Sequence, residues 1–327
     1  MKSSGIGGQA VLEGIMMKNK EKYAVAVRKP DKEIELCVKE YKGLTAKCKI
    51  FGLPFIRGVF NFIDSLVLGM STLMYSAQFF EEEDEKDKSS DKKTEKNSKN
   101  KEIEKKEAEK SDKSSTDKTE SVIMTITMIF SMFLAVGLFI ILPSLISDFV
   151  KNKLDISTYA VVSLVEGFIR ITLFVLYIVL ISRMEDIQRT FMYHGAEHKC
   201  INCIENGLEL NVENVLKSSR LHKRCGTSFL FLVMAISILF FILIPVEDPL
   251  KKVVVRLILI PVIAGVSYEV LKFAGRSDGI IVKIISAPGM ALQRLTTKEP
   301  DAQMAEVAIK AVEAVFDWKE FLKEDNQ

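Results

Sequence analysis

The sequence predicts an α-helical polytopic membrane protein with about four transmembrane helices, a small N-terminal β-containing soluble unit and an interfacial amphipathic helix. Three observations predict this fold class: long apolar segments, charges concentrated in one block, and clustered β-branched residues near the N-terminus. Segments that cross a bilayer exclude charge, so this partition is typical of a membrane protein. The net charge of +2 over 327 residues gives no reason to expect a nucleic-acid partner.

Residues 1–54 are expected to form a small β-rich cytoplasmic unit. β-branched residues alternate or cluster at 23–28 and at 33–39, and the Lys-Pro-Asp-Lys sequence between them favours a turn, so we expect a hairpin. Residues 1–20 contain no apolar run followed by a cleavage site, so no signal peptide is expected. The five cysteines are therefore expected to be reduced thiols or metal ligands.

Residues 55–80 have the pattern of an amphipathic helix, with the polar side chains on one side. Arg57 and Asp64 disfavour a complete span, so we expect a helix that lies in the membrane interface or packs on other membrane helices. Residues 81–120 are rich in Lys, Glu, Asp and Ser and contain no aromatic residue. They predict a disordered charged linker, which we interpret as a tether rather than a docking tail for unknown protein partners.

Residues 121–274 are expected to form a four-helix membrane domain. Apolar segments at about 122–146, 159–181, 228–246 and 253–273 each approach the roughly 20 residues that a helix needs to cross a bilayer. The loop 182–227 holds many Lys and Arg residues, and the positive-inside rule places it and both termini in the cytoplasm. We therefore expect a multi-pass protein of the cell membrane, in contact with the lipid bilayer.

Residues 275–327 are expected to form a cytoplasmic segment with an amphipathic helix. Asp301 is a good N-cap residue, and apolar residues recur at helical spacing from there to about Leu322. We expect this helix to pack on the cytoplasmic part of the protein.

All three histidines of the chain, His194, His198 and His222, lie in the loop 182–227. On a helix, His194 and His198 share a face, and Glu197 projects about 60° to the other side of His194. The order His-x-x-Glu-His is that of the inverted zinc-protease motif, in which the histidines hold zinc and the glutamate activates a water molecule. We therefore expect a transition metal, most of all zinc, with Glu197 as the catalytic base or as a fourth ligand. Either His222 or Cys225 could be the third ligand, and the favoured arrangement uses His222 and keeps Cys225 in reserve.

Two other interpretations of this region stay open. Cys200 and Cys203, followed by His222 and Cys225, have the spacing of a structural zinc ribbon, which requires a tight turn at 200–203. We favour a helix that continues to about Glu205, because turn-forming residues are scarce there. In the other interpretation, the histidines only form hydrogen bonds at the membrane interface.

Further residues could support the site. Glu166 and Arg170 lie four residues apart within a predicted span, where a structural ion pair is favoured over catalysis. Glu269 lies near the cytoplasmic end of the last span, as a further ligand or a partner of a ligand. Gly7 and Gly8 allow a close approach of the backbone to another segment or a ligand.

Four strings carry a resemblance to a known family: residues 7–17, which include Gln9 and Glu13, residues 193–199, residues 222–229 and residues 293–300. On these strings the chain resembles the YqhQ-like family of bacterial membrane proteins over nearly its whole length outside the linker. The resemblance implies a membrane protein of unknown function and a predicted metal-dependent enzyme. The family pattern includes Gln9 and Glu13 and does not require a cysteine at Cys200, which weakens the zinc-ribbon interpretation.

The favoured function is a metal-dependent hydrolase at the cytoplasmic membrane interface, with a peptide, a lipid or a phosphoester as its substrate. One alternative is a non-enzymatic membrane scaffold with a structural metal or a hydrogen-bonded histidine cluster. A second alternative is a transporter, which Glu166, Arg170 and Glu269 suggest. The sequence lacks the paired interrupted helices or the internal repeat that many transporters have.

Overall fold

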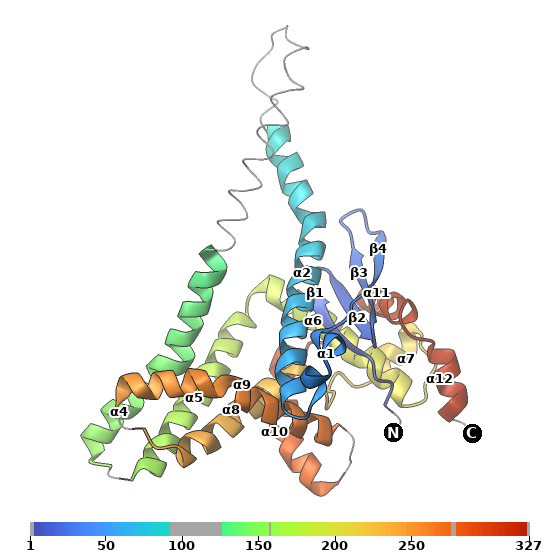
Figure 1. Cartoon of the computed structure of the whole chain (residues 1–327). Coiled ribbons are helices and arrows are strands. Elements are labelled where there is room, and N and C mark those ends of the chain that lie inside the picture. Colours follow the sequence, from blue (N-terminus) through green and yellow to red (C-terminus); the bar gives the residue numbers. More distant parts are fainter. Residues whose placement is uncertain (1–2, 92–125, 157, 247, 276–278, 326–327) are drawn as a thin grey trace. The chain divides into compact units, whose positions relative to one another are not determined.

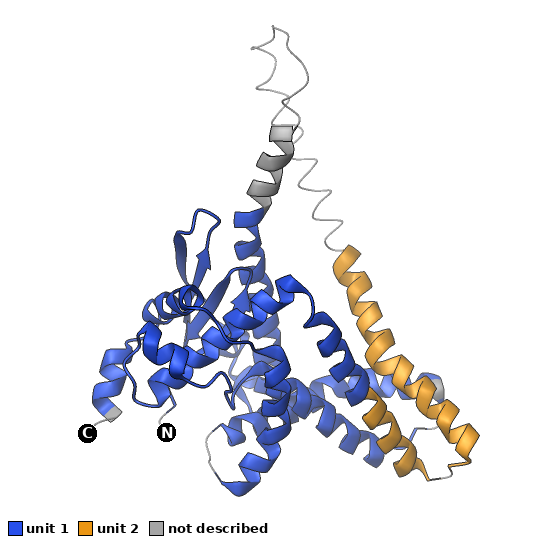
Figure 2. Ribbon diagram, turned by 180° about the vertical axis from the view of Figure 1, so that it is seen from behind, with its two compact units in different colours: residues 1–82, 171–327 blue, residues 83–170 orange. Residues whose placement is uncertain are grey.

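The computed structural model describes residues 3–91, 126–156, 158–246, 248–275 and 279–325 (Figure 1). It divides into two compact units, one formed by residues 1–82 and 171–327 and the other by residues 83–170 (Figure 2). Most of the tract expected as a linker, residues 92–120, lies outside the described residues.

The N-terminal unit is a four-stranded antiparallel sheet in the order β1-β2-β3-β4. Its strands are β1 (Gly7–Val11), β2 (Gly14–Asn19), β3 (Lys22–Arg28) and β4 (Ile34–Glu40). The predicted hairpin is confirmed, because β3 pairs with β4 in antiparallel register. The first two strands were not predicted, because each holds only one β-branched residue, Val11 in β1 and Ile15 in β2.

Helices cover both faces of the sheet. Alternate residues of a strand point to opposite faces. Ile15 and Met17 of β2 pack in one core with α6 (Glu185–Glu205) and α11 (Ala302–Glu313). Met16 of β2 packs in a second core with Leu68 of α2 (Ile56–Asp91). The sheet therefore lies between α2 and the α6–α11 pair.

Helix α2 follows a short helix α1 (Leu44–Lys47) and a 3-10 turn η1 (Lys49–Gly52). It continues past residue 80 to Asp91, into the tract that was expected to be linker. Its segment Ile56–Phe80 is one of five helices that are long and apolar enough to cross a membrane by length and composition, where the sequence predicted about four.

The other four candidate spans match the apolar segments predicted from the sequence. They are Ile126–Leu154, which includes the π-helical turn η3 (Gly137–Ile141) and α4 (Leu142–Leu154), α5 (Tyr159–Ile181), α8 (Gly226–Leu243) and α9 (Pro249–Ala274). Large apolar side chains are exposed on them, such as Phe168 with 72% and Leu243 with 69% of its surface accessible. Exposed apolar faces of this extent are typical of surfaces that contact lipid or another protein.

Glu166 and Arg170 form a buried ion pair in the unit of residues 83–170. Arg170 Nη2 lies 3.0 Å from Glu166 Oε1, and Arg170 Nε donates to the carbonyl oxygen of Phe139 at 3.0 Å. Phe139 belongs to the π-helical turn, so Arg170 connects α5 to this turn as well as to Glu166.

The C-terminal segment contains α10 (Ile280–Thr296), α11 and α12 (Trp318–Asp325). Asp301 caps α11 as predicted, because its side chain accepts the backbone N–H of Met304 at 2.8 Å. The expectation of one helix to about Leu322 is wrong, since α11 ends at Glu313 and α12 follows separately. The apolar face of α11 packs against the sheet and α6.

Candidate metal centre

Helix α6 places His194 and His198 on one face. The helix runs without interruption to Glu205 and ends before Gly207, whose φ of 76° suits the left-handed conformation that glycine tolerates. The favoured helical interpretation is thus confirmed. The turn at 200–203 that a zinc ribbon needs is not formed, and Cys200 and Cys203 are buried in the core beside the sheet.

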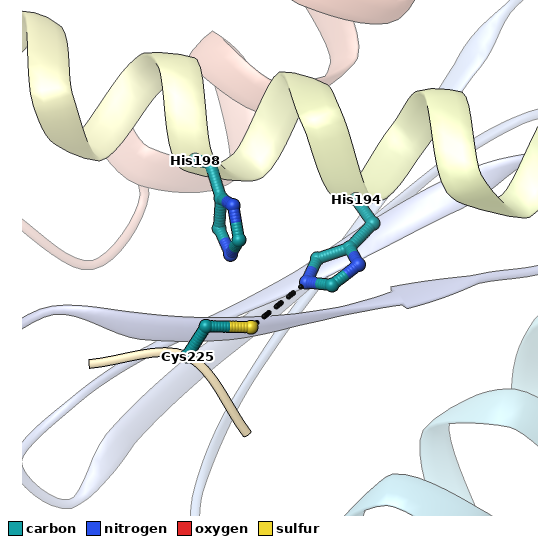
Figure 3. Close-up of side chains that lie close together, drawn as sticks. All are labelled: His194, His198 and Cys225. Atoms are coloured by element: carbon teal, nitrogen blue, oxygen red, sulfur yellow. Dashed lines mark hydrogen bonds between the residues drawn. The ribbon is translucent and has the colours of Figure 1, made fainter. Parts of the chain in front are cut away.

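Three side chains bring together atoms that could bind a metal: His194, His198 and Cys225 (Figure 3). We call these three side chains the ligand group. One ligand atom from each lies within 4.8 Å of the other two. His194 Nε2 lies 3.2 Å from Cys225 Sγ, and the two imidazole rings are 4.4 Å apart between centroids. A metal ion between these atoms would need only small movements to reach its usual bond lengths of about 2.0–2.3 Å.

Backbone carbonyl groups orient both imidazole rings. His194 Nδ1 lies 2.9 Å from the carbonyl oxygen of Thr296, and His198 Nδ1 lies 2.6 Å from that of Arg220. Each Nδ1 therefore donates a hydrogen bond to a carbonyl oxygen, which leaves Nε2 as the nitrogen that can face a metal ion. Histidines that bind metals commonly donate their second nitrogen in this way.

The Nε2 atom of His198 is buried and forms no hydrogen bond of good geometry among the described residues, although the Cys225 side chain lies near enough to act on the pKa of this ring. A buried polar atom without a partner costs free energy, so it calls for an explanation such as a bound ion. Burial lowers the pKa of His198, while Cys225 and the carbonyl group of Arg220 act in the opposite direction. The imidazole is therefore held in the neutral form that a metal requires.

Cys225 is the N-cap residue of α8, and its sulfur, rather than the imidazole of His222, lies close to the candidate ligand atoms of His194 and His198. Gln293, which is fully buried, clamps the backbone of His222. Its Oε1 accepts the N–H of His222 at 2.9 Å, and its Nε2 donates to the carbonyl oxygen at 2.7 Å. The side chain of His222 then points to Glu205, with Nε2 3.5 Å from Oε2. His222 lies beside the ligand group, not in it.

Glu197 precedes His198 and lies against β1. A Cβ atom added to Gly8 would lie 3.0 Å from Glu197 Cδ, so only glycine permits this approach. Burial raises the pKa of Glu197, and the charge of His194 and the backbone N–H of Gly8 partly oppose this rise. Its Oε2 is buried without a hydrogen-bond partner in the described part of the chain. The backbone at Gly8 thus approaches the site closely, as we expected for this glycine.

Gln9 and Glu13 hold the sheet in place rather than joining the ligand group. Glu13 forms an ion pair with Arg189 of α6 and accepts a hydrogen bond from the Tyr193 hydroxyl at 3.4 Å. A Cβ atom on Gly69 of α2 would collide with the side chain of Gln9. The two residues therefore connect the opening hairpin to α6 on one face and to α2 on the other.

Glu269 lies outside the ligand group as well. Its carboxylate forms a two-point ion pair with Arg57, at 2.7 Å to Nε and 2.6 Å to Nη2. Asn61 also donates to the hydroxyl of Tyr268 at 2.9 Å. These contacts join α2 to α9. Glu166 and Arg170 belong to the other compact unit.

Three residues beside the site were missed as site residues: Gln293, Glu205 and Arg224, the partner of Glu205. Arg224 forms an ion pair with Glu205, and Ser4 donates to Glu205 through its backbone and hydroxyl at 2.8 Å. Burial alone would raise the pKa of Glu205, but His222, Ser4 and Arg224 outweigh it and lower the pKa to about 2. A signal was present, since Glu205 falls on the His194 face and Gln293 opens the last of the shared strings.

Comparisons with known proteins match nearly the whole chain, but the matching proteins have no stated activity. Residues 53–318 match the family described as "Protein of unknown function (DUF1385)". The chain is 32% identical over 325 residues to "Uncharacterized protein YqhQ" of Bacillus subtilis (strain 168), covering 98% of this chain and 95% of that protein. No solved structure matches the chain at a significant level. The chain therefore belongs to the DUF1385 family of proteins of unknown function.

Proposed function

We propose that this chain is a metal-dependent hydrolase whose metal centre consists of His194, His198 and Cys225. The observation that carries the proposal is the buried Nε2 of His198. It forms no hydrogen bond of good geometry among the described residues, and it lies within 4.8 Å of two further ligand atoms. A metal ion would satisfy this atom, and the carbonyl groups at both Nδ1 atoms already select the tautomers that bind a metal.

The donor set favours zinc. Two imidazole nitrogens and one thiolate suit zinc better than the oxygen-seeking magnesium or calcium. Structural zinc sites are usually closed by four protein ligands, whereas catalytic sites use three and keep one position for water or substrate. Three converging ligands within the described residues therefore support a catalytic site.

Glu197 is the general base in this proposal. Bound zinc would supply a Lewis acid and lower the pKa of a water molecule at the site. Glu197 Oε2 would accept the proton of that water and return it to the leaving group. The N–H of Gly8 would hold the carboxyl group in place, and the buried surroundings would exclude bulk water.

A structural cluster is the second candidate, and one contact favours it. His194 Nε2 and Cys225 Sγ lie 3.2 Å apart, within hydrogen-bond distance for sulfur. In that case the three side chains would only join α6 to the start of α8. The unpartnered Oε2 of Glu197 is then unexplained, which is why we favour the enzyme.

We further propose a multi-pass location in the cell membrane, with four spans, and with the termini and the metal centre on the cytoplasmic side. The basic loop 182–227 supports this orientation. We place α2 in the interface instead of across the bilayer. Leu68, Tyr75 and Phe79 pack on the sheet, and Ser76 accepts the N–H of Leu12 at 3.1 Å. A helix crossing the bilayer would draw this sheet and its polar residues into the hydrocarbon core.

The test compares Glu197→Gln with Glu209→Gln, a change at an exposed glutamate four residues beyond the end of α6. Both variants and the wild type are purified in detergent, loaded with zinc, and assayed against ester, phosphoester and peptide substrates. We expect Glu197→Gln to keep its zinc and to lose at least about 100-fold of the turnover, in line with general-base catalysis. Equal turnover in Glu197→Gln and Glu209→Gln would exclude Glu197 as the base.

A further inference from the structure

The loop of residues 218–225 holds the carbonyl group that orients His198. This loop connects α7 (Val212–Lys217) to α8, and the carbonyl oxygen of Arg220 within it lies 2.6 Å from His198 Nδ1. An unsupported loop samples many backbone conformations, and ordering it costs conformational entropy. The orientation of this imidazole ring therefore depends on the contacts that hold the loop in one conformation.

Lys199, the residue after His198 on α6, donates hydrogen bonds at the point where α7 ends. Its Nζ lies 2.8 Å from the carbonyl oxygen of Leu216 and 2.7 Å from that of Ser218. The last carbonyl groups of a helix have no donor within the helix, and the lysine satisfies two of them. Nζ also lies 2.9 Å from a carboxylate oxygen of Glu299, and the lysine side chain is only 4% exposed. A buried ammonium group needs such partners because it has lost its water, so the lysine holds the start of the loop.

Asn202, one turn further along α6 than His198, donates to the next part of the loop. Its Nδ2 lies 2.6 Å from the carbonyl oxygen of Ser219 and 3.0 Å from that of Leu221. A side-chain amide has two N–H groups, so both are used here. The two acceptors belong to the residues on either side of Arg220. The asparagine therefore holds the stretch of backbone that carries the Arg220 carbonyl group.

Lys199 and Asn202 can act on the ligand group only through this loop, because neither belongs to the side chains that converge there. Two members of the ligand group depend on the loop. The ring of His198 is oriented by the loop carbonyl, and Cys225 is the last residue of the loop itself. A displaced loop would therefore disturb both of these ligands at once.

We propose that Lys199 and Asn202 are positioning residues of the metal centre, because their hydrogen bonds hold the loop in the conformation in which Arg220 orients His198. This role rests on the proposed metal centre. While its Nδ1 donates to the Arg220 carbonyl group, His198 keeps its Nε2 for a metal ion. Replacing residues that orient a ligand in this way commonly lowers metal affinity by about 10–100-fold.

The test uses the full-length protein in detergent. Two variants, Lys199→Met and Asn202→Leu, remove the donors and keep the approximate size of the side chain. Asn202→Ser is a milder change, since a hydroxyl group has one donor where the amide has two. The matched control is Lys217→Met, which removes an exposed lysine at the end of α7 whose partner is Glu213. Thermal unfolding checks that each variant is folded.

Two properties are measured for each variant. The first is the tautomer of His198 in the metal-free protein at about pH 8, where free imidazole is neutral, read from the ¹⁵N chemical shifts of the ring. The chain has three histidines, so the signal of His198 is identified by its loss in His198→Ala. The second property is the affinity for zinc, measured by competition with a chelator.

We expect the Nδ1-protonated tautomer in the wild type and in Lys217→Met, and a mixture of both tautomers in Lys199→Met and Asn202→Leu. Zinc should bind about 10–100-fold more weakly to these two variants, and Asn202→Ser should show an intermediate loss. Should neither larger change allow folding, Asn202→Ser decides in the same way. Folded variants that keep the wild-type tautomer, or the wild-type affinity for zinc, would overturn the positioning role.

The same measurements separate this role from the proposed hydrolase activity. If the wild type binds zinc and the variants bind it equally well, the positioning role fails and the hydrolase proposal stands. If the affinities fall as expected but the zinc-loaded wild type turns over no substrate, the hydrolase proposal fails and the positioning role stands. A wild type that binds no zinc would overturn the metal centre and both proposals with it.

Discussion

The backbone of Gly8 in β1 lies against the carboxyl group of Glu197 in α6, although the two residues are far apart in the sequence. A Cβ atom at Gly8 would lie 2.7 Å from the carbonyl oxygen of Met16 and 3.0 Å from Glu197 Cδ. The N-terminal sheet is therefore part of the candidate site, since it covers the carboxylate that would act as the base.

Gly8→Ala should destabilise the protein by about 1–3 kcal/mol, the usual cost of forcing an extra methyl group into a packed region. Gly7→Ala is the matched control, because a Cβ atom there meets nothing within 4 Å. Thermal unfolding of both variants in detergent checks this expectation. If both variants unfold at the same temperature, the close contact between β1 and α6 is incorrect.

Glu205 should make stability depend on acid pH. Its pKa is about 2 in the folded protein, below its ordinary value of 4.5, so the folded state favours the charged form. The resulting stabilisation, on the order of 2–3 kcal/mol, is fully present above about pH 4.5 and is lost as the pH falls toward 2. Denaturant unfolding at pH 7 and pH 3 measures it. Glu205→Gln should have a lower free energy of unfolding at pH 7. Between pH 7 and pH 3 this free energy should change much less in Glu205→Gln than in the control variant Glu209→Gln.

Glu269→Ala should keep the metal and weaken the packing of α2 on α9. Its carboxylate pairs with Arg57, at 2.6 Å to Nη2, so its removal leaves the arginine without its acidic partner. A double-mutant cycle with Arg57→Ala should show a favourable coupling between the two side chains, because they form a two-point ion pair. Loss of bound metal in Glu269→Ala would instead make Glu269 part of the metal centre.

The proposed interfacial position of α2 has a geometric consequence. Val67 and Met74 are exposed, away from the residues that pack on the sheet, and lie seven residues apart, or about 10 Å along a helix. Spin labels on cysteines at these positions, with Cys37 and Cys48 replaced by serine, should report nearly equal depths in the bilayer. Labels at Val161 and Phe168 of α5 provide the control, where a depth difference of most of 10 Å is expected. A similar difference on α2 would show that it crosses the membrane.

Local patterns predicted much of this structure. The length of the apolar segments predicted four of the candidate spans, and the spacing of His194 and His198 placed both on one face of a helix that does run to Glu205. Such features depend on neighbours in the sequence, since helix geometry alone determines which side chains share a face.

Contacts between distant segments were not predictable in this way. His222 and Cys225 lie in the same loop, and periodicity cannot choose between them as ligands. The choice follows from Gln293, 71 residues away from His222, which fixes the backbone and turns the imidazole toward Glu205. Likewise, β1 forms because it pairs with β2 and packs on α6, not because its own residues favour a strand.

The most direct test of the metal centre is the zinc content of the purified protein, measured for the wild type, His198→Ala and His222→Ala. Each variant removes a buried histidine, but only His198 belongs to the ligand group of His194, His198 and Cys225. The account predicts about one equivalent of zinc in the wild type and in His222→Ala, and a loss of most of it in His198→Ala. Zinc that persists in His198→Ala, or a wild-type protein that binds none when zinc is supplied, would contradict it.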